Sequence, residues 1–420
     1  MEKGRRAEAV AFLRTAAELL HRYGTPTDRI EDGLMDCARG LGLRLQVLAT
    51  PTAVELAFGA RRQRSFLIRG ESGETELARL VEIDRILVAV GERRLEPARA
   101  RVRLLALAAQ PSPHGPIAQL LAHALLAGSA AAVLEGSVAD VLASAALGLA
   151  IGGLARVASG RPVARLFAPI ATFAAALTSQ GLARLLPGLA EAVIGLASVI
   201  VLLPGLSLTM AMSELATRHL VSGTARLAGA IMVFLTMAFG VALAHRLLAL
   251  GSVPVVLELG PSWTTPLPAI GRALGLLLAP LGACVLFQAR WRDLPAVTIA
   301  GVTGALVSTI TSPSFGPEFA AFAGALVVGV ASNAYARWSA LPSSIVLLPG
   351  LLLLVPGTVG FRSVTAFLAG APTAGVDAAF RMTLVAVALV AGVLMANALL
   401  PLTKPAALTK APPTKALRRG

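Results

Sequence analysis

The sequence predicts an all-α polytopic membrane protein with ten transmembrane helices, arranged as two inverted five-helix repeats, and a small α+β N-terminal cytoplasmic domain. The composition supports a membrane protein, because the 420 residues are 56% hydrophobic, only 14% charged and have a mean hydropathy of +0.75. Residues 1–110 hold 19 of the 37 Lys and Arg and 15 of the 23 Asp and Glu. We therefore expect one domain of ordinary charge density at 1–110, followed by a membrane body.

The N-terminal domain contains the motif AVAFLRTAAELLHRYGTPTDRIEDGLMDCARGLGL, which begins at residue 9. Its apolar spacing predicts a helix, a break at Gly24 and a second helix capped by Thr25 or Thr27. RLQVLATPTAVELAF and RRQRSFLIR alternate as strands do, and ETELARLVEIDRILVAV is an amphipathic helix. We see no nucleophile with a base, no phosphate-binding glycine loop and no histidine cluster. We therefore expect no catalytic residue, no metal site and no cofactor.

The membrane body contains apolar segments of about 17 to 23 residues, long enough to cross a bilayer as helices. The first module, 111–250, has candidate spans at 117–134, 138–155, 166–183, 189–206 and 226–248. The second module, 251–403, has them at 269–288, 294–311, 317–335, 342–358 and 379–399. Residues 404–420 form a basic cytoplasmic tail. Many spans are rich in Ala and Gly, which favours close helix packing.

The distribution of Lys and Arg between the loops predicts the orientation of the chain. With the N-terminus inside, the inner loops and the tail carry thirteen basic residues of the membrane body, and the outer side carries five. We therefore expect a multi-pass protein of the cell membrane with both termini cytoplasmic. The basic residues are scattered among loops with no aromatic platform, which argues against binding of nucleic acid.

A constant offset in the sequence aligns the starts of the five spans in the two modules, although further Pro-Gly pairs at 187 and 349 weaken this signal. This offset places Pro204-Gly205 on Pro356-Gly357 and Gly223 on Gly375. Because each module has an odd number of spans, the second module enters the membrane from the opposite face. Inverted repeats of this kind are typical of secondary transporters, whose solute site lies where helices are broken at the interface between the repeats.

The two Pro-Gly pairs are the predicted helix breaks. Proline removes a helical hydrogen bond, and freed backbone groups at membrane depth need protein or water as partners. Free amides and carbonyls suit a zwitterion. The candidate substrate-binding residues are Pro204, Gly205, Ser207, Thr209, Pro356, Gly357 and Thr358. The alternative is an ordinary proline kink, or a helix end at the interface, with the hydroxyls as caps.

Glu214 is the candidate ion-coupling residue, and two placements are open. On a cytoplasmic interfacial helix it would pair with Arg218 at i+4, which is the more common outcome. If the segment enters the bundle, the carboxyl becomes a site for a proton or an ammonium group, because ionisable groups inside a membrane are costly and usually functional.

Several of these short motifs resemble the threonine/serine exporter family. In LLHRYGTPTDRIE, the residues Gly24, Thr27, Arg29 and Glu31 match its N-terminal signature, and TPT at 50–52 resembles the segment that follows. Pro204-Gly205, Glu214 and LVSGTARL at 220–227, with Gly223 and Arg226, resemble its Pro-Gly, acidic and LVSG-AR block, in which an aspartate is usual where Glu214 stands. LLLLVPGT at 351–358 is similar to the five-span module fused behind that block.

The resemblance implies ten spans and proton-driven export of small hydroxy amino acids. It fixes no substrate contact, so Gly24, Thr27, Arg29, Glu31, Gly223 and Arg226 are candidates for a regulatory or structural role. The expected partners are the lipid bilayer, a small amino acid, protons and, as a homo-oligomer, further copies of the chain. Two alternatives stay open: a passive channel for small polar solutes, and a membrane-anchored hydrolase with a catalytic N-terminal domain.

Overall fold

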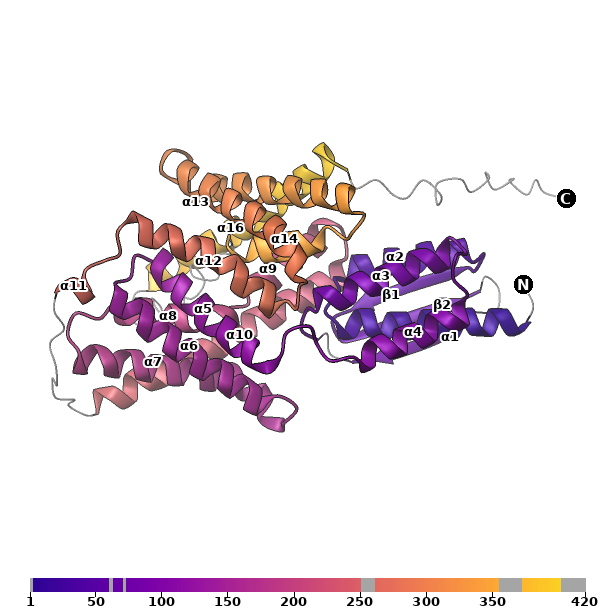
Figure 1. Ribbon diagram of the computed structural model, residues 1–420. Helices are drawn as coiled ribbons and strands as arrows, with labels where there is room; N and C mark the ends of the chain where they lie inside the picture. Colours follow the sequence, from indigo (N-terminus) through magenta and orange to yellow (C-terminus); the bar gives the residue numbers. More distant parts are fainter. Residues whose placement is uncertain (1–2, 60–62, 71–72, 251–260, 355–371, 402–420) are drawn as a thin grey trace. The chain divides into compact units, whose positions relative to one another are not determined.

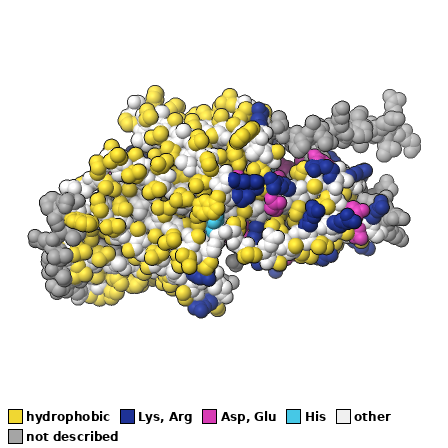
Figure 2. Space-filling view, in the orientation of Figure 1, with side chains coloured by type: hydrophobic (Ala, Val, Ile, Leu, Met, Phe, Trp, Pro, Cys, Tyr) yellow, Lys and Arg dark blue, Asp and Glu magenta, His cyan; other side chains and the backbone are white. Residues whose placement is uncertain are grey.

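A computed structural model describes residues 3–59, 63–70, 73–250, 261–354 and 372–401. The chain forms two compact units. One holds the described residues up to Gln110 together with 336–342 and 400–401, and the other holds 111–335 and 343–399 (Figure 1). In Figure 2, hydrophobic side chains cover the visible face of the second unit, whereas most charged side chains lie on the first.

The first unit packs four helices and a three-stranded antiparallel sheet. Its elements are α1 (Lys3–Arg22), α2 (Thr27–Gly40), β1 (Leu45–Thr50), β2 (Ala53–Phe58), β3 (Arg64–Arg69), α3 (Leu77–Gly91) and α4 (Pro97–Ala109). The strands lie in the order β1-β2-β3, and residues 48, 55 and 67 face one another across the sheet. Phe12, Leu34, Leu56 and Ile83 are fully buried in the core between helices and sheet. The α+β character was predicted, but α4 was not.

The turn between α1 and α2 depends on Gly24. Its φ is +71°, and a Cβ at this position would lie 2.8 Å from the carbonyl oxygen of Gly73. Only glycine adopts this left-handed conformation at no steric cost. The expected threonine cap was wrong: Pro26 is the N-cap residue and no side chain caps the helix, while Thr27 is its buried first residue. Proline suits this place because its φ is fixed and the helix follows directly.

The second unit is helical. Its longer helices are α5 (Pro116–Val133), α6 (Val138–Ala158), α7 (Phe167–Leu185), α8 (Glu191–Ser198), α9 (Gly205–Ala216), α10 (Leu220–Ala249), α12 (Ala269–Leu286), α13 (Leu294–Ser339), α14 (Ser344–Leu352) and α16 (Pro372–Leu399). Three short turns of 3₁₀-helix, η1 (Pro162–Leu166), η2 (Ile200–Leu202) and η3 (Trp291–Asp293), and the short helix α11 (Pro261–Thr264) connect them. In the described residues, six helices are long and apolar enough to cross a membrane, and seven if α8 and α9 form one bent span.

Helix α13 is two helices joined at a break. Its 46 residues would extend about 69 Å, more than twice the hydrocarbon thickness of a bilayer. Gly316 interrupts it with φ 83° and ψ 167°, and Pro313 and Pro317 flank the break. The two parts coincide with the predicted spans 294–311 and 317–335. The full number of ten spans stays a prediction.

Candidate functional site

A discontinuous helix lies at the predicted break in the first module. Helices α8 and α9 are bent by 49° relative to each other, and the turn η2 lies between them. α8 packs against α5, α6 and α7, and α9 packs against α10, α14 and α16. The broken segment is therefore surrounded by helices from both predicted modules.

Pro204 and Gly205 are buried at the point where α9 begins. Pro204 is the N-cap residue of α9, with φ −77° and ψ 34°, and no side chain caps the first amides of this helix. The first amides of a helix have no partner inside the helix, and they favour a negative charge. The break predicted from the sequence is present, and it leaves backbone donors at a buried position.

The hydroxyl groups near the break differ in how they are used. Thr209 is buried, and its hydroxyl donates to the carbonyl oxygen of Gly205 at 3.0 Å. Ser207 is half-buried and lies nearer the break. Pro356, Gly357 and Thr358, the candidates from the second module, lie outside the described residues. The structure therefore brings together only the first-module half of the predicted substrate site.

Glu214 lies inside the bundle near the C-terminal end of α9, and only 3% of it is exposed. The side chain of Arg226 on α10 holds its carboxylate through Nη2 to Oε1 at 3.1 Å and Nε to Oε2 at 3.2 Å. The hydroxyl of Ser222 also donates to Oε2, at 2.9 Å. Both carboxylate oxygens thus accept hydrogen bonds from the start of α10.

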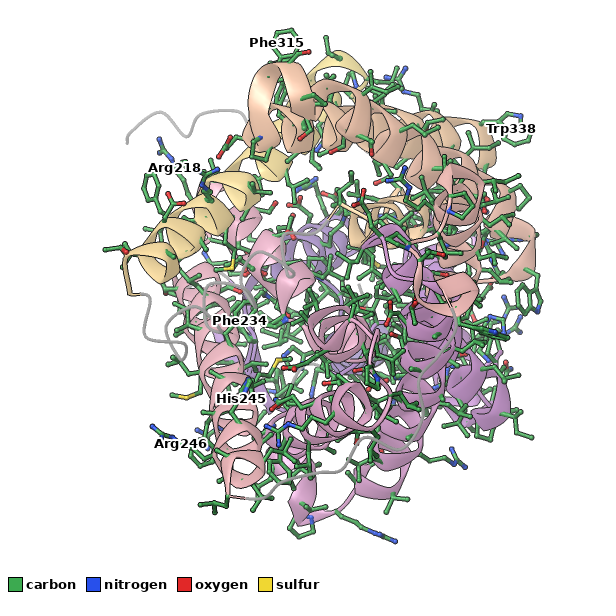
Figure 3. All side chains as sticks on the ribbon, turned by 90° about the vertical axis from the view of Figure 1, so that its left-hand side faces the viewer. Arg218, Phe234, His245, Arg246, Phe315 and Trp338 are labelled. Atoms are coloured by element: carbon green, nitrogen blue, oxygen red, sulfur yellow. The ribbon has the colours of Figure 1, made fainter. Side chains whose placement is uncertain are left out.

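The expected pairing of Glu214 with Arg218 was wrong. α9 ends at Ala216, and Arg218 has a left-handed φ of 66° in the turn that follows. The i+4 rule applies only within a continuous helix. The reversal of the chain turns Arg218 outward, where it is exposed (Figure 3), and brings Arg226 onto the carboxylate. Of the two placements considered for Glu214, the buried one is observed.

Gly223 permits the close approach of α9 and α10. A Cβ on Gly223 would lie 2.9 Å from the backbone nitrogen of Leu215 and 3.0 Å from the carbonyl oxygen of Ala211. The residues of the LVSGTARL segment therefore make one set of contacts with α9. Gly223 allows the two helices to approach, and Ser222 and Arg226 bind the carboxylate of Glu214. The sequence suggested Gly223 and Arg226 as candidates but not the role of Ser222, because pairings across a turn leave no periodic signal.

Glu31 and Arg29 of the N-terminal motif interact with other elements of the first unit. The Oε1 atom of Glu31 on α2 accepts a hydrogen bond from the amide of Ala49 on β1 at 2.9 Å. Burial raises the pKa of Asp84 on α3, and the positive charge of Arg29 on α2 partly opposes that rise. These contacts connect α2 to the sheet and to α3, with Gly24 shaping the turn before it.

Two buried aspartates of the second unit were not predicted. Asp140 is 2% exposed at the start of α6 and forms a reciprocal cap with Ser137, and its Oδ1 accepts from the amide of Ala190 at 2.8 Å. Asp293 is 1% exposed just before α13, and its Oδ1 accepts from the hydroxyl of Tyr335 at 2.6 Å. The spacing of Ser137 and Asp140 before an apolar run was a readable capping signal.

Among the described residues, no group of three or more His, Cys, Asp or Glu side chains is arranged to hold a metal ion.

Comparison with known families gives two matches. The model described as "Putative threonine/serine exporter" matches residues 11–248, and the model described as "Threonine/Serine exporter, ThrE" matches residues 272–399. The first match includes residues 11–110 of the first unit, the broken helix α8–α9 and the Glu214–Arg226 pair.

Curated relatives come from fungi and bacteria. Pheromone-regulated membrane protein 10 of Candida albicans is 26% identical over 387 residues, 86% of this chain and 34% of the relative. The protein of that name in Eremothecium gossypii is 31% identical over 172 residues, 39% of this chain and 22% of the relative. The probable threonine/serine exporter of Mycobacterium tuberculosis is 28% identical over 204 residues, 46% of this chain and 38% of the relative.

The matches thus span between about a fifth and two fifths of the length of these curated relatives. No solved structure matches this chain.

Proposed function

The chain belongs to the threonine/serine exporter family, and from this premise we propose that it is a secondary active exporter of threonine, serine or similar small solutes, driven by inward protons. The membership confirms the resemblance seen in the short motifs, and it makes the chain a membrane protein of a transporter family. The mechanism proposed is alternating access of two inverted five-helix modules. Four sets of contacts support the duplication and its inversion.

The first support is a repeated turn. Glu135 follows α5 with φ 63°, and Gln288 follows α12 with φ 50°. The amide of the following residue then donates to the carbonyl oxygen five positions earlier. Gly136 donates to Ala131 at 2.9 Å, and Ala289 donates to Cys284 at 2.8 Å. The buried Asp140 and Asp293 each lie five positions beyond the left-handed residue of their turn. We therefore propose that α5 and α12 are equivalent helices, with Glu135 aligned to Gln288.

The second support is the packing of these equivalent helices. A Cβ on Gly275 of α12 would lie 3.0 Å from the carbonyl oxygen of Ser129 on α5, and one on Gly282 would lie 3.4 Å from that of Ala122. α12 therefore runs antiparallel to α5. In the alignment of the two turns, Gly275 corresponds to Ala122 and Gly282 to Ser129, so the two contacts are reciprocal, as expected around a two-fold axis.

The third support is an exchange of the segments that precede α5 and α12. The imidazole Nε2 of His114, before α5, bonds to the carbonyl oxygen of Ala289 in the turn after α12, at 2.6 Å. The amide of Leu267, before α12, donates to the carbonyl oxygen of Gly136 in the turn after α5, at 3.0 Å. Each segment contacts the turn of the other module at equivalent positions.

The fourth support concerns the third and fifth helices of each module. A Cβ on Gly240 of α10 would lie 2.5 Å from the carbonyl oxygen of Pro169 on α7. A Cβ on Gly392 of α16 would likewise clash with the carbonyl oxygen of Phe322 on α13. The similarity of these two contacts supports treating the α7–α10 and α13–α16 pairs as equivalent. Ser179-Gln180 and Ser332-Asn333 take matching places in the third helices.

The single observation that carries the transport mechanism is the buried helix break at Pro204-Gly205. Broken helices at a repeat interface are the usual solute site of inverted-repeat transporters. We assign the uncapped amides at the start of α9 to the carboxylate of the solute, and Ser207 and Thr209 to its polar side chain. Pro356, Gly357 and Thr358 are proposed to complete the site from the second module.

Glu214 is proposed as the coupling charge. Protonation of its carboxylate would weaken the two bonds from Arg226, and so would loosen the contact between α9 and α10 next to the solute site. The pair thus offers a way for one proton to change the position of the broken helix. Residues 1–110 are proposed to regulate transport from the cytoplasm, with both termini on that side.

The test is reconstitution of the full chain in lipid vesicles loaded with labelled threonine or serine. We expect efflux to be faster when a proton gradient is directed into the vesicles, opposite to the movement of the amino acid, than when no gradient is present. A passive channel predicts efflux that follows the solute gradient and ignores pH. If neither amino acid moves, the proposed solute is wrong. Glu214→Gln should leave efflux insensitive to the pH gradient, and the matched control Glu135→Gln, at an exposed carboxylate, should keep the sensitivity.

A further inference from the structure

The two equivalent turns differ at one position that bears on the solute. Ser137 in the turn after α5 corresponds to Arg290 in the turn after α12, since each lies two positions beyond the left-handed residue of its turn. Both residues bind the buried aspartate of their own turn. Ser137 donates from its hydroxyl to Oδ2 of Asp140 at 2.7 Å, and Arg290 donates from Nε to Oδ2 of Asp293 at 2.8 Å. The turn after α12 therefore contains a cation where its counterpart contains a hydroxyl.

The guanidinium of Arg290 is only partly used. Nε and Nη2 bind the two oxygens of Asp293, at 2.8 and 3.2 Å. Nη1 is buried and has no hydrogen-bond partner in the described part of the chain. A buried donor on a charged group that lacks a partner costs free energy, so such a group calls for an explanation. The oxygens of Asp293 are occupied by Arg290 and by the hydroxyl of Tyr335, so this aspartate does not supply the missing acceptor.

We infer that Nη1 of Arg290 binds the carboxylate of the solute at the cytoplasmic entrance, before the solute reaches the broken helix α8–α9. A carboxylate matches the planar donors of a guanidinium better than other small groups do. Two arginines, Arg290 and the exposed Arg292, surround one aspartate, so the cluster keeps one positive charge for an anionic group. In the equivalent turn, Asp140 is bound by the hydroxyl of Ser137, and the cation found there, Arg272, pairs with the carboxylate of Glu135.

The asymmetry fits an exporter. With the predicted orientation, the turn after α12 faces the cytoplasm, where the solute is collected, and the turn after α5 faces outward, where it is released. This inference rests on the proposed function for the identity of the solute. The chemistry of the site, recognition of a carboxylate, follows from Arg290 alone.

Trp291 provides a direct probe of binding. It follows Arg290 in the chain, and its ring packs edge-on against His114 with centroids 4.7 Å apart. In the full-length protein carrying Trp263→Phe and Trp338→Phe, threonine and acetate should change the emission of Trp291 saturably. Threoninol, which has a hydroxymethyl group in place of the carboxylate, should not. No response to threonine or acetate, or an equal response to threoninol, overturns the inference.

The decisive variant is the double substitution Arg290→Gln with Asp293→Asn, which removes the guanidinium without leaving a buried carboxylate unpaired. It should weaken the response to threonine at least tenfold and raise the KM for cytoplasmic threonine by a similar factor, with kcat little changed. Ser137→Ala, in the equivalent turn, should leave both unchanged. Affinity equal to that of the wild type in the double variant overturns the inference.

If the double variant does not fold, Arg290→Lys takes its place. The ammonium group of lysine cannot bind both oxygens of Asp293 and, at the same time, the carboxylate of the solute. Binding of the solute should therefore again fall at least tenfold. Unchanged binding in this variant also overturns the inference. The two proposals can be tested separately. A fluorescence response of Trp291 without threonine efflux would refute threonine as the transported solute. Threonine efflux without that response would refute the binding site at Arg290.

Discussion

The carboxylate of Glu214 and the guanidinium of Arg226 meet across the turn between α9 and α10, through contacts of 3.1 and 3.2 Å. The two residues are twelve positions apart and are both largely buried. A buried ion pair adds little net stability over an apolar pair, but removing one partner leaves an uncompensated charge. The contact between α9 and α10 therefore depends on both charged side chains being present.

Arg226→Ala should destabilise the protein by about 3–5 kcal/mol, because it leaves Glu214 buried without its cation. Thermal unfolding of the purified protein in detergent measures this effect. The double variant Glu214→Gln with Arg226→Met should recover most of the loss, since no charge stays buried. Arg218→Ala, which removes an exposed cation from the neighbouring turn, serves as the control and should unfold like the wild type. Equal losses for Arg218→Ala and Arg226→Ala would contradict the assignment of the partner.

Gly275→Ala should weaken the contact between α5 and α12. The added methyl group would lie 2.8 Å from the Cβ of Ala132, and overpacking of this kind costs about 1–3 kcal/mol. Gly229→Ala on α10 is the matched control, because nothing lies within 4 Å of a Cβ there, and alanine in an open helical position is favourable by about 0.5–1 kcal/mol. The unfolding temperatures of the two variants should therefore move in opposite directions. A shift of the same sign in both would argue against close packing at Gly275.

Asp84→Asn should stabilise the N-terminal unit at neutral pH. Burial raises the pKa of Asp84 in the folded state, against the smaller opposing effect of Arg29. The folded state then binds more protons than the unfolded state in the interval between the two pKa values, so stability falls as the pH rises through that interval. Asparagine removes this loss, and its advantage should disappear when the pH falls below both values.

Hydrogen exchange of the α3 amides in the full-length protein, corrected for the intrinsic pH dependence, measures this effect. Glu82→Gln is the control on the same helix, because Glu82 forms an exposed pair with Arg85, and such pairs contribute little. An advantage of Asp84→Asn that persists at low pH would contradict the cause proposed here.

Cys37 should resist alkylation in the native protein. Burial raises the pKa of its thiol to about 12, and the thiolate is the reactive form. In a variant with Cys284→Ala, a maleimide reagent at pH 8 should label Cys37 only after denaturation, as mass spectrometry would reveal. Rapid labelling of the folded chain would mean that α2 opens often enough to expose the thiol.

The features predicted correctly from the sequence were those with a local physical cause. Proline removes a helical hydrogen bond and glycine weakens a helix, so a break at Pro204-Gly205 and the start of α9 were predictable, although the pair Pro349-Gly350 lies inside α14. Alternation and helical spacing likewise predicted the strands and helices around Gly24. α4 was missed because PARARVRLLALAA follows the predicted amphipathic helix closely and carries three arginines, which hid its apolar stripe.

The pairings that depend on how the chain folds back were not predictable in the same way. Arg218 is closer to Glu214 in the sequence than Arg226 is, so the sequence favours Arg218 as its partner. Because α9 ends at Ala216, the partner in the structure is Arg226 instead. The offset that places Pro204 on Pro356 in the sequence is one position shorter than the offset that aligns Glu135 with Gln288 in the proposed duplication. Reciprocal contacts such as that of His114 with Ala289 join residues 175 positions apart, and no sequence period reports them.

The exchange of the segments before α5 and α12 has a consequence for how the molecule is assembled. His114 completes the turn that ends α12, and Leu267 completes the turn that ends α5, so neither half contains all the partners for its own loops. A chain cut between the halves should yield two pieces that are unstable when made singly and that recombine when made together. During synthesis, the half made first should therefore complete its turn only after the other half has been made.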